Sequence, residues 1–240
     1  SDIKYIINSH EQNCGHAATG YAKSSKKTGV VLVTSGPGIT NMITPMLDAT
    51  NDSTPLVVIS GQVSKEAVGT NAFQEAPAVD LSKNVTKWSY QIKNIQEIDS
   101  VIDKAFNIAN NGKKGAVHID IPKCVSSGSI EVSTRNFFTE NCKVNKSVLR
   151  EKFENTTYSY RLSGTDNVSK MISTCEKPII YLGQGCVDSF KLLREFAIKS
   201  NIPVTSTIHG CGIFDESHKL SLGWCGMHGY AVANYALQEA

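Results

Sequence analysis

Short apolar runs alternate along the chain with stretches whose apolar residues recur every three or four positions. The short runs predict strands, because each is rich in Val or Ile and is bounded by Gly, Pro, Ser or Asn. The predicted strands are Lys4–Ile7, Gly29–Thr34, Pro55–Ser60, Ala116–Ile121, Pro178–Leu182 and Ile202–Thr207. The predicted helices are Glu11–Ser24, Ile39–Asp48, Ile98–Asn110, Asp166–Cys175 and Ser189–Lys199.

Apolar strands that alternate with helices are typical of parallel sheets covered on both faces. We therefore expect an α/β protein with two doubly wound parallel-sheet domains. Between Cys124 and Thr165 the composition changes to Ser, Asn, Thr, Lys and Glu without a sustained period, which predicts a linker. The predicted boundaries are 1–124 for the first domain, 125–164 for the linker and 165–240 for the second. The second has only two predicted strands, so we expect it to be incomplete.

Composition narrows the class of protein. Of 240 residues, 40% are hydrophobic and 19% are charged, which supplies a core and excludes wholesale disorder. The net charge of +2 is scattered, so no basic stripe predicts nucleic-acid binding. No apolar run approaches the ~20 residues of a membrane span, and no signal peptide is visible at the start. We expect a soluble protein.

The seven cysteines are odd in number and include no Cys-x-x-Cys pair, which favours a reducing intracellular compartment over a secreted disulfide framework. Two histidines and two cysteines near the end of the chain, His209, Cys211, Cys225 and His228, could supply zinc ligands. Their spacing matches no closed zinc site, and small cysteines in an α/β core explain the pattern equally well. We assign no metal ligand in this chain.

Candidate chemistry in the first domain lies where predicted strands end. Glu11 begins a helix, where a carboxylate is also favoured by the helix dipole alone. Thr34–Asn41 reads Thr-Ser-Gly-Pro-Gly-Ile-Thr-Asn, a turn into a helix that matches neither a dinucleotide fingerprint nor a P-loop. Gln62 follows another strand, and the loop Gly69–Glu75 could clasp a planar polar ligand. Alternatively, Phe73 simply plugs the core.

Glycine-edged turns follow the strands of the second domain in the same way. Gly183-Gln184-Gly185 and Thr207–Gly210 come directly after strands, and Gly226-Met227-His228-Gly229 follows further on. In open α/β sheets ligands bind at that edge, so these turns predict a crevice for an extended cofactor. His228 alone is more often a structural histidine.

Taken together, these stretches resemble thiamine-diphosphate enzymes, and specifically the acetohydroxyacid synthase (acetolactate synthase) catalytic subunit. The first domain is similar to the pyrimidine-binding domain of that family, and the second to its central, FAD-carrying domain. The resemblance rests on His10-Glu11-Gln12, Thr34–Asn41, Ser60–Val63, Gly69–Glu75, His118–Lys123, Ile202–Thr205, Ser221–Gly223 and Gly226–Gly229.

The resemblance implies roles for residues of the first domain. Glu11 would hydrogen-bond N1′ of the aminopyrimidine, and for that role we expect a buried carboxyl with a raised pKa. Phe73 and Gln74 would face the site where a second keto acid joins. The residues that would shape the pyrimidine pocket are Pro37, Gly38 and Asn41, with Gln62 nearby.

For the second domain the resemblance implies that FAD lies, in a structural role, along Gly183, Gly185, Thr207, Ile208, Met227 and His228. Arg161 would match a flavin-contacting arginine of the family linker. The chain departs from the family at Asn71, where an aspartate is usual, and at Ile208-His209, where Leu-Met is usual. The Gly-Asp-Gly…Asn motif that holds Mg²⁺ and the diphosphate is absent, so the Mg²⁺ ligands would lie outside this chain.

The implied function is part of an acetolactate synthase. Such an enzyme decarboxylates pyruvate on thiamine diphosphate and ligates the product to pyruvate or 2-ketobutyrate, in branched-chain amino-acid biosynthesis. The chain would belong to a longer subunit, active as a homodimer or larger, with a possible regulatory subunit and no turnover alone. The alternatives are another thiamine-diphosphate decarboxylase or carboligase, a non-catalytic homologue, and, at fold level, a dehydrogenase. The implied compartment is the cytoplasm in a prokaryote or virus, and a plastid or mitochondrion in a eukaryote.

Overall fold

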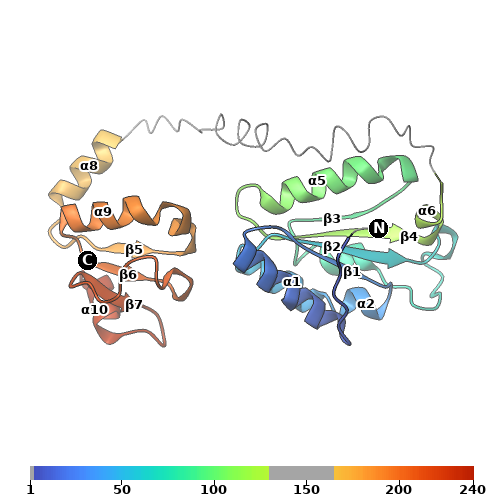
Figure 1. Ribbon diagram of the computed structural model, residues 1–240, viewed down its shortest axis with the longest axis horizontal. Coiled ribbons are helices and arrows are strands. Elements are labelled where there is room, and N and C mark those ends of the chain that lie inside the picture. The colour runs from blue at the N-terminus through green and yellow to red at the C-terminus, as the bar shows by residue number, and fades with distance from the viewer. Residues whose placement is uncertain (1–2, 130–164) are drawn as a thin grey trace. The chain divides into compact units, whose positions relative to one another are not determined.

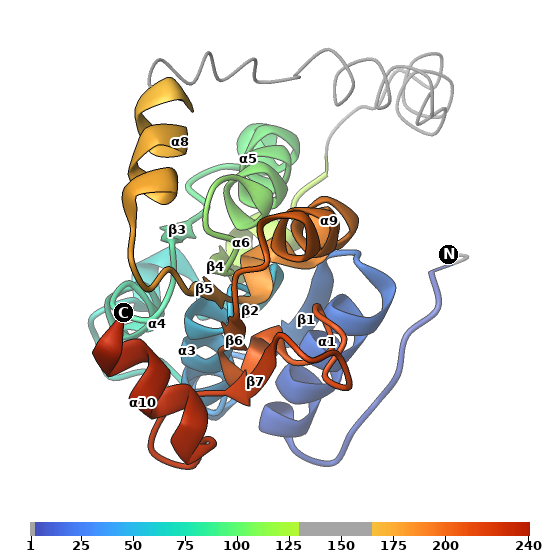
Figure 2. The same ribbon diagram turned by 90° about the vertical axis from the view of Figure 1, so that its left-hand side faces the viewer.

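The structure is a computed structural model that describes residues 3–129 and 165–240. The chain divides into two compact units, Ser1–Cys142 and Lys143–Ala240, each with its own parallel sheet (Figures 1 and 2). Of the predicted linker, residues 130–164 lie outside the described residues, so the predicted domain boundaries stay predictions. Over the described ranges, no helix combines the length and the apolar character that a membrane span needs.

The first unit is built on a four-stranded sheet in the order β1-β2-β4-β3, with all neighbours parallel. Its strands are β1 (Gly29–Val33), β2 (Leu56–Gln62), β3 (Trp88–Gln91) and β4 (Ala116–Pro122). Its helices are α1 (Glu11–Ser25), α2 (Pro37–Thr40), α3 (Ile43–Asn51), α4 (Ala78–Ser82), α5 (Ile98–Asn110) and α6 (Lys123–Ser126), with 3₁₀ turns at Lys65–Ala67 and Ile95–Glu97.

Helices cover both faces of this sheet. On one face α5 buries Val101, Ala105 and Ala109 against β2 and β4, and Figure 1 shows α1 and α2 on the other side. On that second face the core is formed by alternate residues of β1 and by α3. Helices α1 and α3 approach closely, because a Cβ at Gly15 would lie 2.4 Å from Pro45.

The second unit holds a three-stranded parallel sheet in the order β5-β6-β7. Its strands are β5 (Ile180–Leu182), β6 (Val204–Ser206) and β7 (Ser221–Trp224), and its helices are α8 (Thr165–Thr174), α9 (Phe190–Ser200) and α10 (Ala231–Glu239). Two 3₁₀ turns, Gln184–Ser189 and Ile208–Gly210, follow β5 and β6. The core packs Leu182, Val204 and Ala197 against Ile213 and Phe214.

The α/β class with two parallel, doubly wound units is confirmed, but three predicted elements differ. Lys4–Ile7 is not a strand in the structure, and its side chains are exposed. The predicted helix Ile39–Asp48 breaks at Asn41 and Met42 into α2 and α3. The second sheet has three strands rather than two, because Ser221–Trp224 also pairs with β6.

Candidate functional site

The predicted carboxylate lies at the carboxyl edge of the first sheet, hydrogen-bonded to another predicted residue. Glu11 opens α1 directly after His10, whose ring Nδ1 accepts a hydrogen bond from the backbone N–H of Gln12 (3.1 Å). Asn41 ends α2, the short helix that follows β1, and its Nδ2 donates to Glu11 Oε2 at 2.9 Å. The structure therefore brings together Glu11 and Asn41, which are thirty residues apart in sequence.

The electrostatic state of Glu11 differs from the expectation. Its side chain is half-buried rather than buried. The hydrogen bond from Asn41, with smaller contributions from a backbone N–H and from His10, lowers the Glu11 pKa below its ordinary value, and partial burial opposes this only weakly. The expectation of a raised pKa is therefore wrong for this structure, in which Glu11 is an ionised hydrogen-bond acceptor.

The turn between β1 and α2 needs glycine at one position. Gly36 has a φ of +61°, and a Cβ built there would lie 2.8 Å from the carbonyl oxygen of Gln74. The turn therefore lies directly against the backbone of the loop that carries Phe73 and Gln74. Gly38 is buried behind it, and Pro37 is exposed at the first helical position.

The loop Gly69–Glu75 is held from within by its own last residue. The Glu75 carboxylate accepts hydrogen bonds from the backbone N–H groups of Gly69 and of Ala72, the latter at 3.1 Å, and these bonds lower the Glu75 pKa. Gly69, Asn71 and Gln74 all have positive φ. Phe73 is 89% exposed, so the reading of this side chain as a core plug is wrong.

Gln62 is turned inward. Its Nε2 donates to the carbonyl oxygen of Ala76 at 2.9 Å and to Asp120 Oδ2 at 3.2 Å, and its Oε1 accepts the N–H of Val63 at 2.9 Å. The side chain is buried and links the sheet to the chain just after the Phe73–Gln74 loop. The structure thus places Gln62 behind this loop, as part of its support.

A buried polar group inside the first sheet was not predicted; we call it the Asp120 network. Asp120 Oδ1 accepts from the Ser60 hydroxyl (2.6 Å), and Asp120 Oδ2 accepts from Gln91 (2.8 Å) as well as from Gln62. The members of the network are Ser60, Gln62, Ser82, Gln91, His118 and Asp120. The sequence signal was available, because the polar residues His118 and Asp120 interrupt an otherwise apolar strand.

The pKa values in this network follow from burial. Desolvation lowers the pKa of His118 to about 4, so the ring is neutral at pH 7. Its Nε2 lies 2.8 Å from Ser60 Oγ, and its Nδ1 lies 2.7 Å from Ser82 Oγ. Burial raises the pKa of Asp120, while the hydrogen bonds from Ser60, Gln91 and Gln62 oppose that rise.

In the second unit the predicted cofactor residues lie at the ends of neighbouring strands. Gly183 follows β5 and faces Thr207, which follows β6, since a Cβ on Gly183 would lie 3.8 Å from the Thr207 side chain. Gly185 is open. Ile208 is 63% exposed and Met227 is 91% exposed, and His228 is also exposed.

The turn that carries Met227 and His228 is held by a residue that was not predicted. The Asn234 side chain accepts from the N–H of Gly226 at 2.9 Å and donates to the carbonyl oxygen of Gly226 at 3.0 Å. Arg161, the remaining predicted flavin contact, lies outside the described residues. No metal ligand set of three or more His, Cys, Asp or Glu side chains occurs in residues 3–129 and 165–240.

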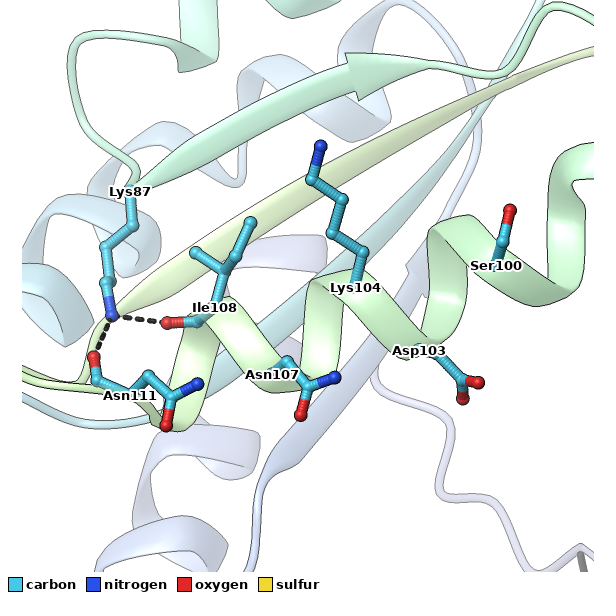
Figure 3. A pocket seen from close by; sticks show the side chains of 7 residues that line it. All are labelled: Lys87, Ser100, Asp103, Lys104, Asn107, Ile108 and Asn111. Atoms are coloured by element: carbon cyan, nitrogen blue, oxygen red, sulfur yellow. Dashed lines mark hydrogen bonds between the residues drawn. The ribbon is translucent and has the colours of Figure 1, made fainter.

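A hollow of about 610 Å³ lies at the opposite edge of the first unit, on the outer side of α5 (Figure 3). Lys87 precedes β3, and its Nζ donates to the carbonyl oxygens of Ile108 and of Asn111, the latter at 2.6 Å. Lys104 Nζ lies 4.6 Å from the centre of the Trp88 ring. Lys87 therefore caps the end of α5, and Lys104 joins α5 to Trp88 of β3.

Comparison with known proteins gives two family matches. Residues 1–83 match the thiamine pyrophosphate enzyme, N-terminal TPP binding domain, and residues 165–240 match the thiamine pyrophosphate enzyme, central domain. Both matches fall in the units whose sheet edges carry the candidate residues.

Curated relatives align with almost the whole chain. The mitochondrial acetolactate synthase catalytic subunit of Saccharomyces cerevisiae is 40% identical over 241 residues, covering 99% of this chain and 34% of that protein. Acetolactate synthase isozyme 1 large subunit of Escherichia coli is 37% identical, covering 100% and 40%. The Lactococcus lactis large subunit is 41% identical, covering 99% and 40%. The chain thus spans between 34% and 40% of the length of these relatives.

Proposed function

Because the chain belongs to the thiamine pyrophosphate enzymes, with their N-terminal and central domains, we propose that it is part of an acetolactate synthase catalytic subunit. The complete subunit would decarboxylate pyruvate and join the resulting two-carbon unit to pyruvate or 2-ketobutyrate. Names of relatives at 37–41% identity favour this reaction over other thiamine-dependent carboligations. The single observation that carries the proposal is the Glu11–Asn41 pair beside the Gly36–Gln74 contact.

The residues at this edge fit an aminopyrimidine ring. An ionised carboxylate can accept a hydrogen bond from a protonated ring nitrogen, and Asn41 fixes the direction in which Glu11 presents its oxygens. The bound cofactor would supply an electron sink for decarboxylation. Glu11 would stabilise a proton on the ring nitrogen, and exclusion of water around the carboxylate would raise its pKa from the lowered value toward that of the ring.

Phe73 and Gln74 would meet the second keto acid. Both side chains are exposed on a loop whose backbone is fixed at Gly36 and at Glu75. An exposed ring and an adjacent amide suit a small substrate with an apolar methyl group and a polar carboxylate.

FAD would lie along the carboxyl edge of the second sheet. The open glycine turn at Gly183–Gly185 leaves room for a ligand to approach the backbone, and Ile208, Met227 and His228 offer exposed surface beside it. Its role would be structural, so these residues would bind and orient it. Mg²⁺ would be held by residues outside this chain.

The partners follow from the same proposal. The active unit would be a homodimer or larger, with a possible regulatory subunit. Relatives include proteins named as mitochondrial, chloroplastic and bacterial, so the proposed compartment is the cytoplasm in a prokaryote or virus and a plastid or mitochondrion in a eukaryote.

The experiment is Glu11→Gln in the complete catalytic subunit, assayed for acetolactate formed from pyruvate. Loss of this proton-handling group should lower kcat by about 10²–10⁴-fold. Glu66→Gln, which changes a carboxylate on the neighbouring 3₁₀ turn, is the matched control and should keep activity. Near-normal turnover of the Glu11 variant would refute the assignment. Flavin absorbance in the purified protein separates this proposal from a flavin-free decarboxylase.

A further inference from the structure

The hydrogen bonds of the Asp120 network converge on one carboxylate. Asp120 accepts from Ser60, so the single hydroxyl proton of Ser60 is committed and its oxygen accepts from His118 Nε2–H. The ring Nδ1 lies 2.7 Å from the Ser82 hydroxyl, which also donates to the carbonyl oxygen of Ala78 at 2.8 Å. The groups that donate to Asp120 itself are Ser60, Gln62 and Gln91, so the network converges on the carboxylate as acceptor.

Asp120 supplies the acceptor oxygens at the centre of this network. Its two oxygens accept from Ser60, Gln62 and Gln91. An alanine would remove both oxygens and leave these three donors without this acceptor. Leaving a buried donor unpaired is more costly than losing an exposed hydrogen bond.

Gln62 links Asp120 to the end of the Phe73–Gln74 loop. The two Nε2 protons of Gln62 go to Asp120 and to the carbonyl oxygen of Ala76, and Val63 N–H fixes its Oε1. With all three groups engaged, the side chain has one orientation. Ala76 follows Glu75 directly, so this bond fixes the end of the Phe73–Gln74 loop.

The loop needs such an anchor because its backbone is strained. Gln74 has a φ of +58°, a conformation unfavourable for a residue with a side chain. Its backbone also lies so close to Gly36 that a Cβ there would be 2.8–3.0 Å from Gln74 backbone atoms. A segment held in this conformation persists only when the surrounding structure holds it at both ends. Gly36 provides one support, and Gln62 provides the other.

We propose that Asp120 is a positioning residue that sets the place of Phe73 and Gln74 through Gln62 and the Ala76 carbonyl. The functional part of this inference rests on the proposed carboligase activity. The structural part, that a carboxylate beneath the sheet edge controls the order of this loop, stands without it.

The first test is amide hydrogen exchange of peptides from residues 69–77, with β1 peptides as an internal reference. Asp120→Ala should speed exchange in 69–77 by about 10–100-fold and leave β1 within about twofold. Gln62→Met should reproduce this effect with Asp120 intact, which keeps the test decisive if Asp120→Ala does not fold. The matched control is Gln91→Met, which removes another donor to Asp120 from the edge strand β3 and should leave 69–77 unchanged.

The second test is kinetic. In the complete subunit Asp120→Ala should raise the KM for pyruvate about tenfold, while the Kd of thiamine diphosphate, whose aminopyrimidine the proposed function assigns to Glu11 and Asn41, stays within about twofold. A fall in kcat alone is what fewer folded molecules would give, and it would overturn the proposal. Equal acceleration of exchange by Gln91→Met, or none by Gln62→Met, would overturn it too. A wild-type protein without acetolactate activity would refute the proposed function, while the exchange result would still decide the role of Asp120.

Discussion

The two sheet edges hold their candidate residues in different ways. In the first unit Glu11, Gly36 and Gln62 each contact another part of the site through a hydrogen bond or a close backbone approach. In the second unit Ile208 and Met227 present mostly exposed side chains. The candidate residues of the first edge are therefore held in place by the protein itself. The second would order its side chains only when a ligand covers them, which lowers the affinity gained per contact.

The sharpest way to test this contrast is to remove one buried polar side chain from the middle of each sheet. His118→Ala should destabilise the first unit by about 4 kcal/mol, because it leaves a cavity and removes the hydrogen bonds that join the ring to Ser60 and Ser82. Thr205→Ala, which removes a buried hydroxyl that donates to Gly223 at 3.0 Å, should cost the second unit about 1–2 kcal/mol. Native-state hydrogen exchange at β2 and β6 measures the two stability losses. Equal losses would show that the two units do not differ in how much their buried polar side chains stabilise them.

Acid should weaken the first unit selectively. The His118 pKa is about 4 in the folded state against an ordinary value of 6.5, so the unfolded chain takes up the proton first as the pH falls. Stability is therefore complete above pH 6.5 and is progressively lost down to pH 4, by about 3 kcal/mol in all. Asp120 acts in the opposite sense, because its raised pKa means that protonation relieves a buried charge.

The measurement is the free energy of exchange at β2 between pH 7 and pH 4, compared in the native protein and in His118→Gln. The variant retains Asp120 but lacks the titrating ring, so the difference between the two curves isolates His118. If the free energy of exchange at β2 depends on pH in the same way in both proteins, His118 does not contribute to the acid sensitivity of the first unit. No histidine among the described residues of the second unit is buried, so β6 serves as the internal control.

The two sheet edges also differ in how much space surrounds their glycines. Gly36→Ala places a Cβ within 2.8–2.9 Å of Gln74 backbone atoms at a φ of +61°, and we expect a loss of about 2 kcal/mol. Gly185→Ala meets no atom within 4 Å and should change stability by less than about 0.5 kcal/mol. Thermal unfolding of both variants checks this. A tolerated Gly36→Ala would mean that the Gly36–Gln74 contact is not tight.

The sequence predicted the bounds of an element most accurately where one periodic pattern determines the structure. Helix Ile98–Asn110 is observed with its predicted limits, since its apolar stripe faces a single sheet. Strand β3 was missed because Trp88–Gln91 is a half-buried edge strand without an apolar run. Strand β7 was missed because Gly223, at a φ of +74°, interrupts a four-residue segment.

The candidate site was predictable in its members but not in its contacts. The resemblance pointed to Glu11 and Asn41, and their hydrogen bond depends on the break between α2 and α3, which periodicity concealed. Lys4–Ile7 reads as a strand from composition alone, but a strand needs a pairing partner, which the pattern does not specify. Gln62 was predicted to lie near a pocket. Only the position of Asp120 on the neighbouring strand shows that the Gln62 amide faces inward.

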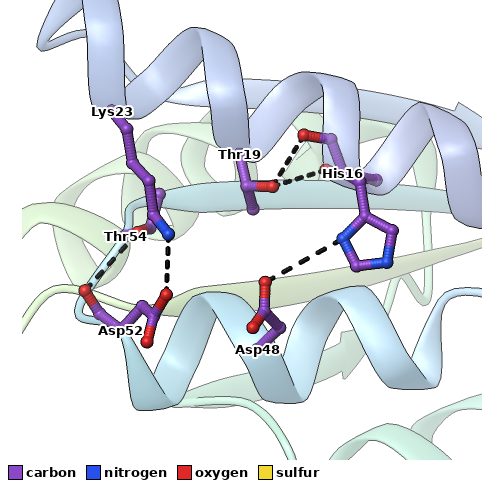
Figure 4. Close-up of polar contacts among 7 residues, drawn as sticks. His16, Thr19, Lys23, Asp48, Asp52 and Thr54 are labelled. Carbon is purple, nitrogen blue, oxygen red and sulfur yellow. Dashed lines mark hydrogen bonds and ion pairs between the residues drawn. The ribbon is translucent and has the colours of Figure 1, made fainter.

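The smallest expected effect concerns surface ion pairs, which should not distinguish the units strongly. In the first unit Lys23 Nζ on α1 lies 2.6 Å from Asp52 Oδ2 at the end of α3, and His16 lies 3.9 Å from Asp48 one turn away (Figure 4). In the second, Lys199 and Glu195 form a more exposed pair within α9, also at 2.6 Å.

Lys23 should contribute more than Lys199, because it neutralises a carboxylate placed at the negative end of a helix and joins two helices. We expect a coupling of about 0.5–1 kcal/mol for Lys23–Asp52 and about 0.3 kcal/mol for Lys199–Glu195. Double-mutant cycles to alanine in low salt measure both, and about 0.5 M NaCl should reduce them. A Lys23–Asp52 coupling that is no larger than that of Lys199–Glu195, or that resists salt, would mean that packing between α1 and α3, rather than charge, holds the helix carrying Glu11 in place.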